Sequence, residues 1–195
     1  MSIVKVLGIS GSPRAGGNSE TLLAEALKGA SSQGAEARMV ELRTAEITHC
    51  QGCNSCFSDG ECRIEDGMTS LYELLTEAEV IILSSPVYFS GLSSVMKQFI
   101  DRCQCLWARK EVLGRTVGAP GRKGALISVG GQSSPVFRNS ISVARSFFNS
   151  IDVEYMGELT APAVDSKGEV FDKPWLLREA RELGETLAKR SEPAP

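Results

Sequence analysis

The sequence predicts an α/β fold in which a five-stranded parallel sheet is covered by helices on both faces. Two observations favour this fold class. Short apolar runs alternate with stretches of helical periodicity five times along the chain, and 195 residues can bury one substantial core without dividing into two. We therefore expect a single domain over residues 1–190, followed by a flexible tail at 191–195.

Five short apolar runs supply the expected strands. The strongest pattern contains the run Val80 to Leu83, because a continuous apolar and β-branched stretch is typical of a strand buried on both faces. The first run is similar and ends at a cluster of Ser, Gly and Pro. In chain order, the predicted strands cover residues 3–9, 37–42, 78–84, 124–130 and 153–159.

Helical periodicity follows four of these strands. After the first strand, Asn18 or Ser19 is the expected N-cap, and Gly34 is expected to end the strand-helix unit. One apolar stripe of this helix should face the sheet. The stripe consists of Leu22, Leu23, Ala26 and Leu27. Further helices are predicted over residues 93–103, 134–150 and 174–190.

Composition narrows the possible functions. The formal net charge is -3, which argues against a protein that binds DNA or RNA by neutralising phosphates. No apolar run approaches the roughly 20 residues that span a bilayer, and residues 1–9 lack the pattern of a signal peptide. We expect a cytoplasmic protein that binds neither nucleic acid nor membrane.

Three loops should meet at one edge of the sheet. A flavodoxin-like strand order, 2-1-3-4-5 in a three-layer sandwich, is the natural choice for this alternation of strands and helices. In such folds ligands bind beyond the carboxyl ends of the strands, near the point where the strand order reverses. Residues 10–19, 85–91 and 130–135 each follow a predicted strand directly. We expect them to form the binding site.

The first of these loops has the composition of an anion-binding site. Residues 10–19 combine small residues, which let the backbone approach a ligand, with hydroxyl, amide and guanidinium donors. The loop also precedes a helix, whose free N-H groups and positive dipole end favour a phosphate monoester. The spacing matches neither a Rossmann nor a Walker loop. The alternative is a glycine-rich turn that only reverses the chain.

The second loop suits a planar ring. Pro86, Val87, Tyr88 and Phe89 offer backbone amides and an aromatic pair at a strand end, which can hydrogen-bond to a ring system and stack on it. The alternative is that Tyr88 and Phe89 cover the core.

Four cysteines gather within thirteen residues. Cys50, Cys53, Cys56 and Cys62 have the spacing C-x2-C-x2-C-x5-C inside a segment at 49–66. Four thiolates suit an iron-sulfur cluster or zinc, and free thiols or a redox disulfide are the alternatives. We expect His49 to lie beside such a centre without ligating it.

We expect the two remaining cysteines and the residues near them to have structural roles. Cys103 and Cys105 are expected to pack in a partly buried position. Asp101 and Arg102 are interpreted as a local ion pair or an interface group. Residues 104–122 form an insert that could shape the binding-site entrance or a subunit contact, with Trp107 and Arg109 packing in the loop or at that contact.

The first loop also carries a family resemblance. Gly11 to Arg14, followed by Gly17, Asn18, Ser19 and a Leu-Leu helix, resembles the NADPH-dependent FMN reductase branch of the flavodoxin-like superfamily. The resemblance extends to residues 85–89 and 97–102. It implies that the phosphate of FMN is held by Ser10, Ser12, Arg14, Asn18 and Ser19. It also implies that Pro86, Val87, Tyr88 and Phe89 line the flavin edge and that Gly130, Gly131 and Gln132 close the third side.

The cysteine spacing resembles the compact motif of the archaeal-type iron-sulfur flavoproteins, which carry one [4Fe-4S] cluster beside FMN. The resemblance implies that Cys50, Cys53, Cys56 and Cys62 ligate the cluster, that electrons pass between it and FMN, and that the protein is a homodimer or homotetramer. Other similar relatives are NAD(P)H-dependent oxidoreductases that need no cluster.

Three functions therefore stay open at the level of sequence. The first is an iron-sulfur flavoprotein served by a ferredoxin-like donor, in which the cofactors do the chemistry and no side chain acts as an acid or base. The second is an NAD(P)H-dependent reductase of quinones, azo compounds, nitro compounds or free flavin. The third is a non-enzymatic zinc or thiol sensor.

Overall fold

The computed structural model describes residues 3–133 and 137–189. Five parallel strands form a sheet in the order β2-β1-β3-β5-β6, and β1 lies between β2 and β3 with continuous register on both sides. The strand order reverses between β1 and β3, which is where flavodoxin-like folds bind ligands. The parallel strands are β1 (Lys5–Ser10), β2 (Glu36–Glu41), β3 (Val80–Tyr88), β5 (Arg122–Gly130) and β6 (Val153–Pro162).

The flavodoxin-like α/β prediction is confirmed, but the predicted count of five strands, with order 2-1-3-4-5, is not. A sixth strand, β4 (Gly91–Leu92), pairs antiparallel with the end of β3, so that the order in chain numbering is 2-1-3-5-6 with β4 beside β3. Phe89 and Ser90 make the turn, with φ of 48° and 62° in the left-handed region. Such turns usually carry Asn-Gly or Asp-Gly, so no hairpin signal is present in the sequence here.

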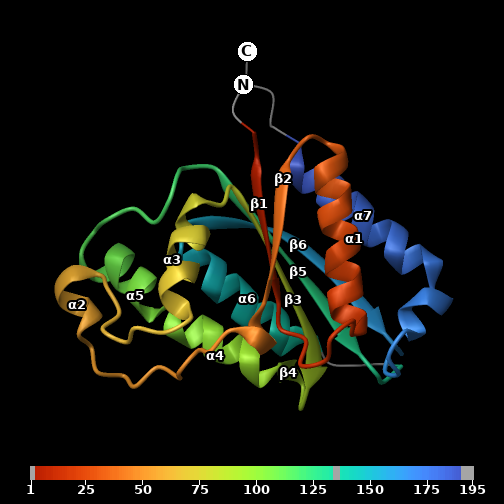
Figure 1. Ribbon diagram of the computed structural model, residues 1–195, viewed down its shortest axis with the longest axis horizontal. Coiled ribbons are helices and arrows are strands. Elements are labelled where there is room, and N and C mark those ends of the chain that lie inside the picture. Colours follow the sequence, from red (N-terminus) through yellow and green to blue (C-terminus); the bar gives the residue numbers. More distant parts are fainter. Residues whose placement is uncertain (1–2, 134–136, 190–195) are drawn as a thin grey trace.

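Helices cover both faces of the sheet, as Figure 1 shows. The two helices α1 and α7 lie on one face, and α3, α4 and α6 lie on the other. The longer helices are α1 (Asn18–Ser32), α3 (Met68–Glu77), α4 (Ser94–Arg102), α6 (Arg138–Ser150) and α7 (Pro174–Ala188). The predicted helix start at 134–136 and the predicted tail at 191–195 lie outside the described residues.

The start of α1 differs from the prediction in one respect. The predicted stripe is buried: Leu22, Leu23 and Ala26 have no exposed surface. The N-cap residue, however, is Gly17 rather than Asn18 or Ser19. The Asn18 side chain instead accepts hydrogen bonds from Gly168 N and Val170 N and donates one to Ser166 O. It therefore joins the start of α1 to the loop that follows β6.

Two glycines allow α1 and α7 to cross in close contact. A β-carbon on Gly29 would lie 2.0 Å from the carbonyl oxygen of Arg181, and one on Gly184 would lie 1.8 Å from that of Ala26. Real β-carbons do not approach backbone oxygens so closely, so both positions require glycine. This contact fixes the position of α1 and of the loop before it.

Besides the short helix in the cysteine segment, two regions contain helices that were not predicted from the sequence. The first is α3, whose Met68, Leu71 and Leu75 are buried in the core on the α4 and α6 face. The second is the insert at 104–122, which begins with α5 (Gln104–Trp107) and continues as a π-helical turn (Ala108–Val112).

The insert packs on the cysteine segment. The Trp107 ring lies 5.9 Å from that of Phe57 in the short helix α2 (Cys56–Asp59), centroid to centroid. Arg109 donates a hydrogen bond from Nε to Gly60 O (2.9 Å) and pairs with Glu61. Of the two predicted roles for Trp107 and Arg109, loop packing is confirmed.

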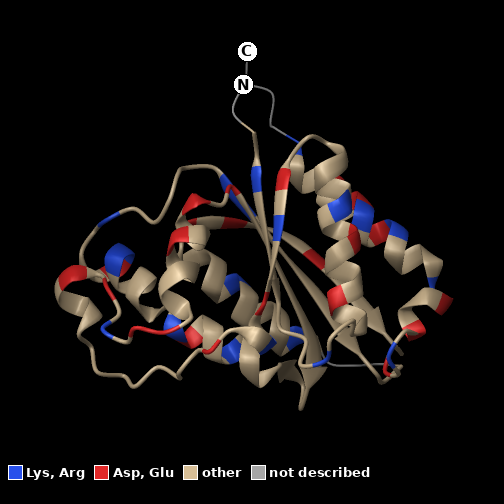
Figure 2. Cartoon of the chain, in the orientation of Figure 1, with Lys and Arg blue, Asp and Glu red and all other residues tan. Residues whose placement is uncertain are grey.

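Charged side chains are distributed evenly over the molecule. Figure 2 shows acidic and basic positions interspersed on the helices of both outer layers. Some form exposed pairs, such as Lys97 with Asp101. Within the described residues, no helix has the length and apolar character needed to cross a membrane.

Candidate functional site

A pocket opens at the carboxyl edge of the sheet, where four segments meet. We call it the loop pocket, because the loop between β1 and α1 forms one wall. The ends of β3 and β5 and the loop after β6 form the others. Its lining residues are Ser12, Pro13, Arg14, Gly17, Asn18, Ser19, Pro86, Val87, Tyr88, Val129, Gly131, Val164, Asp165 and Lys167.

A second hollow, the outer pocket, adjoins the loop pocket and shares Val87, Gly131 and Asp165 with it. Its other lining residues are Phe89, Ser90, Gly130 and Gln132. No residue of the described segment 104–122 lines either hollow, so the prediction that the insert shapes the entrance is wrong.

The structure therefore brings together eleven of the twelve residues predicted for the cofactor site. The exception is Ser10, which is fully buried within β1 and directs its hydroxyl toward Glu20, 3.3 Å away. Ser10 lies behind the loop rather than in either pocket. Because strand residues alternate between the two faces of a sheet, the sequence alone did not decide which way this hydroxyl points.

Hydrogen bonds between residues of the loop after β1 hold it in a compact turn. Ser12 Oγ donates to Arg14 O (2.8 Å) and accepts from Arg14 N (3.2 Å), and Gly17 N donates to Arg14 O (3.1 Å). A β-carbon on Gly17 would lie 2.5 Å from Ser12 Oγ, so only glycine fits this turn. The turn leaves the N-terminal N-H groups of α1 facing the pocket region, where an anion is favoured.

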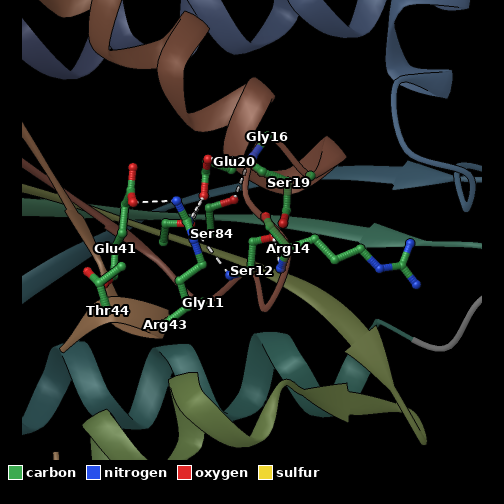
Figure 3. A network of polar contacts seen from close by, with 12 residues as sticks. Gly11, Ser12, Arg14, Gly16, Ser19, Glu20, Glu41, Arg43, Thr44 and Ser84 are labelled. Carbon is green, nitrogen blue, oxygen red and sulfur yellow. Dashed lines mark hydrogen bonds and ion pairs between the residues drawn. The ribbon is translucent and has the colours of Figure 1, made fainter. Parts of the chain in front are cut away.

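Two cationic side chains stand beside this turn. The Arg14 side chain extends away from the turn, as Figure 3 shows. Lys167, which the sequence analysis missed, also lines the pocket, and its Nζ lies 3.6 Å from a β-carbon built on Gly16. Lys167 lies in the loop after the last strand, and the loops after the other strands were already predicted to bind the ligand. The predicted end of the last strand, residue 159, lies three residues before the end of β6. Both cations favour a bound phosphate.

The aromatic residues of the second loop lie at the surface. Phe89 is fully exposed and 42% of Tyr88 is exposed, so the interpretation of these rings as core cover is wrong. Tyr88 borders the loop pocket and Phe89 the outer pocket. Both rings are available to a ligand that is planar and partly apolar.

The four clustered cysteines are not gathered around one centre. Cys53 is exposed, Cys56 is buried, and Cys50 and Cys62 are intermediate, while all six cysteines of the chain are free thiols. Among the described residues, no three His, Cys, Asp or Glu side chains lie together as a metal site. The residue types suit iron-sulfur or zinc, but their arrangement here does not fit a bound metal centre.

The thiols also differ in acidity. A hydrogen bond with the Ser55 side chain lowers the pKa of Cys53, whereas burial raises the pKa of Cys56. Cys103 and Cys105 are buried as predicted, and burial raises the pKa of Cys105 to about 11. His49 is exposed beside Cys50.

A buried arginine holds both ends of the cysteine segment. Arg102 Nη1 donates to Thr48 O (2.7 Å) and to Asp66 (2.6 Å), and Nη2 donates to Ile64 O (3.1 Å) and approaches Cys62 Sγ (3.6 Å). Its side chain has no exposed surface. Arg102 thereby joins the residues before Cys50 and those from Cys62 onward to α4.

Arg102 and Asp101 do not pair with each other, so that interpretation was wrong. Asp101 pairs with Lys97 on the surface, and Arg102 pairs with Asp66 in the interior. Partial burial acts to raise the pKa of Asp66, but hydrogen bonds from Arg102, Thr48 N and Met68 N outweigh it and lower the pKa to about 2. Asp66 is therefore ionised at neutral pH.

Comparison with known proteins assigns the family. The sequence profile described as NADPH-dependent FMN reductase matches residues 4–159, which include both predicted flavin loops. The chain belongs to this family. Family membership makes it a flavin-dependent oxidoreductase that uses FMN.

Individual relatives agree with this assignment. An iron-sulfur flavoprotein of Methanocaldococcus jannaschii is 35% identical over 145 residues, covering 74% of this chain and 72% of that protein. An iron-sulfur flavoprotein of Archaeoglobus fulgidus is 40% identical over 126 residues, covering 65% of this chain and 62% of its own length. An NAD(P)H:quinone oxidoreductase from Methanothermobacter marburgensis shares the fold with a TM-score of 0.73 and 14% identity, covering 99% and 100% of the two chains.

Proposed function

We propose that the loop pocket holds the phosphate of FMN at the start of α1 and that the isoalloxazine ring extends toward the outer pocket. The observation that carries the proposal is the meeting of four carboxyl-edge segments at one pocket. Ser12, Arg14, Asn18 and Ser19 would surround the phosphate, with Ser10 supporting the loop from behind. Pro86, Val87, Tyr88, Phe89, Gly130 and Gly131 would border the ring.

The donors at this site suit an anchored cofactor. Backbone N-H groups at the start of α1 and two nearby cations, Arg14 and Lys167, favour a phosphate group. Tyr88 and Phe89 offer apolar surface to a ring. We assign no acid or base role to a side chain, because the flavin supplies the redox chemistry and the protein supplies binding and orientation.

The anchoring role is tested with Arg14→Met. We expect FMN to bind about tenfold more weakly, because a charge-assisted contact to the phosphate is lost. Riboflavin lacks the phosphate, so its affinity should not change. Arg38→Met, at an exposed position of β2, is the matched control. Equal weakening of FMN and riboflavin binding would remove Arg14 from the phosphate site.

We propose further that Cys50, Cys53, Cys56 and Cys62 bind a [4Fe-4S] cluster and that FMN exchanges electrons with it. Their spacing and the names of two relatives support this. Binding would require the four thiols to converge, since they do not form a metal site within the described chain. The glycines at 52 and 60, both with positive φ, allow tight turns in this segment.

Direct reduction by NAD(P)H is the second candidate. The outer pocket favours it, because Phe89, Ser90 and Gln132 border a space beside the proposed ring position where a second planar group could lie. The family description also names NADPH. In this case the acceptor would be a quinone, an azo or nitro compound, or free flavin.

One set of measurements separates these functions. Protein purified without oxygen is assayed for flavin, iron and acid-labile sulfide, and bound flavin is then mixed with NADPH or with a reduced ferredoxin. About four irons per chain, lost in Cys53→Ser, and faster reduction by ferredoxin support the iron-sulfur flavoprotein. Flavin without iron and rapid bleaching by NADPH support the reductase. A chain that binds zinc and takes up no FMN would instead be the zinc or thiol sensor.

A further inference from the structure

A carboxylate lies directly behind the proposed phosphate loop. Glu20 is the third residue of α1 and is 9% exposed. Its Oε1 accepts a hydrogen bond from Gly16 N (2.8 Å), and its Oε2 accepts one from Ser10 Oγ (3.3 Å). Glu20 therefore joins the end of β1, the loop and the first turn of α1. This resembles a capping box, in which an N3 glutamate accepts from a backbone N-H near the N-cap.

This position creates an electrostatic conflict. The start of a helix attracts anions, and here a carboxylate and a phosphate would both occupy the region around it. Like charges in a partly buried environment repel more strongly than in water. An uncompensated Glu20 carboxylate would therefore oppose binding of a phosphate, even though its hydrogen bonds shape the loop.

Arg43 supplies the compensating charge. It lies in the short 3-10 turn Leu42–Thr44 that follows β2, and its side chain is 18% exposed. One guanidinium nitrogen pairs with Glu20 and the other with Glu41 (Figure 3). Arg43 is absent from the residues that line the loop pocket within the described chain. Arg14 does line that pocket, and its side chain extends away from Glu20 (Figure 3). Arg43 acts on the carboxylate behind the loop.

We propose that Arg43 is a positioning residue for phosphate binding, because it neutralises the Glu20 carboxylate that holds the loop and so lets the loop accept the phosphate of FMN. The inference rests on the proposed placement of FMN and adds to it a requirement for a residue outside the pocket. It assigns two linked roles: Glu20 shapes the loop, and Arg43 makes that loop compatible with an anion.

A double-mutant experiment with FMN and riboflavin tests the proposal. Dissociation constants are measured by flavin fluorescence for the full chain and for Arg43→Met, Glu20→Gln, the double variant and Arg43→Lys. We expect Arg43→Met to weaken FMN binding by about tenfold or more, equivalent to about 1.4 kcal/mol, and to leave riboflavin binding within about twofold. The double variant should recover most of the loss, because the neutral amide no longer repels phosphate.

The controls separate charge from folding. Arg38→Met removes a cation from an exposed position of β2 and should bind FMN like the unaltered chain. Thermal unfolding is followed for every variant. If Arg43→Met does not fold, Arg43→Lys and the double variant still decide the question. Lysine keeps the compensating charge and the double variant removes the Glu20 charge, so both should bind FMN nearly as tightly as the unaltered chain, and weak FMN binding by both would overturn the inference.

Two results would overturn the inference. One is an Arg43→Met variant that binds FMN as tightly as the unaltered chain. The other is a double variant that binds FMN no better than Arg43→Met. This result would show that the weaker binding of Arg43→Met does not come from repulsion by the Glu20 carboxylate. A different result would overturn the proposed phosphate site itself: an unaltered chain that binds FMN and riboflavin equally well.

Discussion

The loop after β1 and the cysteine segment are both organised by an arginine paired with a carboxylate, yet only one of them presents an assembled site. Arg43 pairs with Glu20 behind the loop, and Arg102 pairs with Asp66 beside the cysteine segment. The loop, the ends of β3 and β5 and the loop after β6 meet at one pocket. The four thiols of the cysteine segment do not form a metal site within the described chain.

The difference has a physical origin. The carboxyl ends of neighbouring parallel strands lie at one edge, so the sheet itself brings the flavin loops together. The cysteine segment has a four-residue helix and is otherwise irregular before α3, so its thiols receive no comparable support from regular structure. Metal binding commonly completes the folding of such segments. Variants at each region test this contrast.

Replacing Arg102 by methionine should have the largest effect. The change leaves the Asp66 carboxylate without its buried partner and removes the bonds to Thr48 O and Ile64 O. We expect a loss of about 3 kcal/mol or more in the free energy of unfolding, measured with urea. Lys97→Met, at an exposed pair on the same helix, should cost less than about 1 kcal/mol. Equal losses in the two variants would contradict a special role for Arg102.

Gly184→Ala tests whether the contact between α1 and α7 supports the loop after β1. The added β-carbon would contact the Ala26 carbonyl at 1.8 Å, so α1 and α7 would have to separate. We expect a loss of about 2 to 3 kcal/mol in thermal or urea unfolding and weaker FMN binding, because α1 carries the loop. Glu182→Ala on the same helix is the control and should change stability by less than about 0.5 kcal/mol. Unchanged stability of Gly184→Ala would show that the two helices are not in close contact.

Acid should weaken the cysteine segment through Asp66. Its pKa of about 2 in the folded chain lies below the ordinary value of 3.8. Ionised Asp66 therefore stabilises the fold fully above about pH 4, and this contribution of about 2 kcal/mol is lost as the pH falls toward 2. Urea unfolding of the chain and of Asp66→Asn between these pH values measures the difference. If the free energy of unfolding changes equally with pH in the two proteins, Asp66 is not the titrating group.

Alkylation should distinguish the thiols. Cys53 is exposed and its pKa is lowered by the hydrogen bond with Ser55, whereas burial raises the pKa of Cys56 and Cys105. Iodoacetamide at neutral pH should modify Cys53 on the order of tenfold faster than Cys56, as followed by peptide mass mapping. Cys53→Ser identifies the fast site. Equal rates at Cys53 and Cys105 would contradict the structure, and protection of the four clustered cysteines after iron loading would support a bound cluster.

Local patterns in the sequence predicted most of the sheet and the loops that line the loop pocket and the outer pocket. The strongest run, Val80 to Leu83, is fully buried in β3, and the stripe that begins at Leu22 faces the core. These predictions succeeded because strand and helix periodicity and the need for small residues in a turn are local properties of the chain. The β4 hairpin escaped prediction because Phe89 and Ser90 adopt left-handed backbone without glycine.

The amino-acid sequence was enough to predict the fold class, the residues near the loop pocket and a cluster of four thiols. The packing of the chain was needed to show that Asn18 binds the loop after β6, that Ser10 points away from the pocket, and that Arg43 and Arg102 each meet a carboxylate. The Glu20 and Arg43 positions are 23 residues apart, and Asp66 and Arg102 are 36 apart. No local pattern links residues at such separations, because their contact depends on how the strands and helices pack.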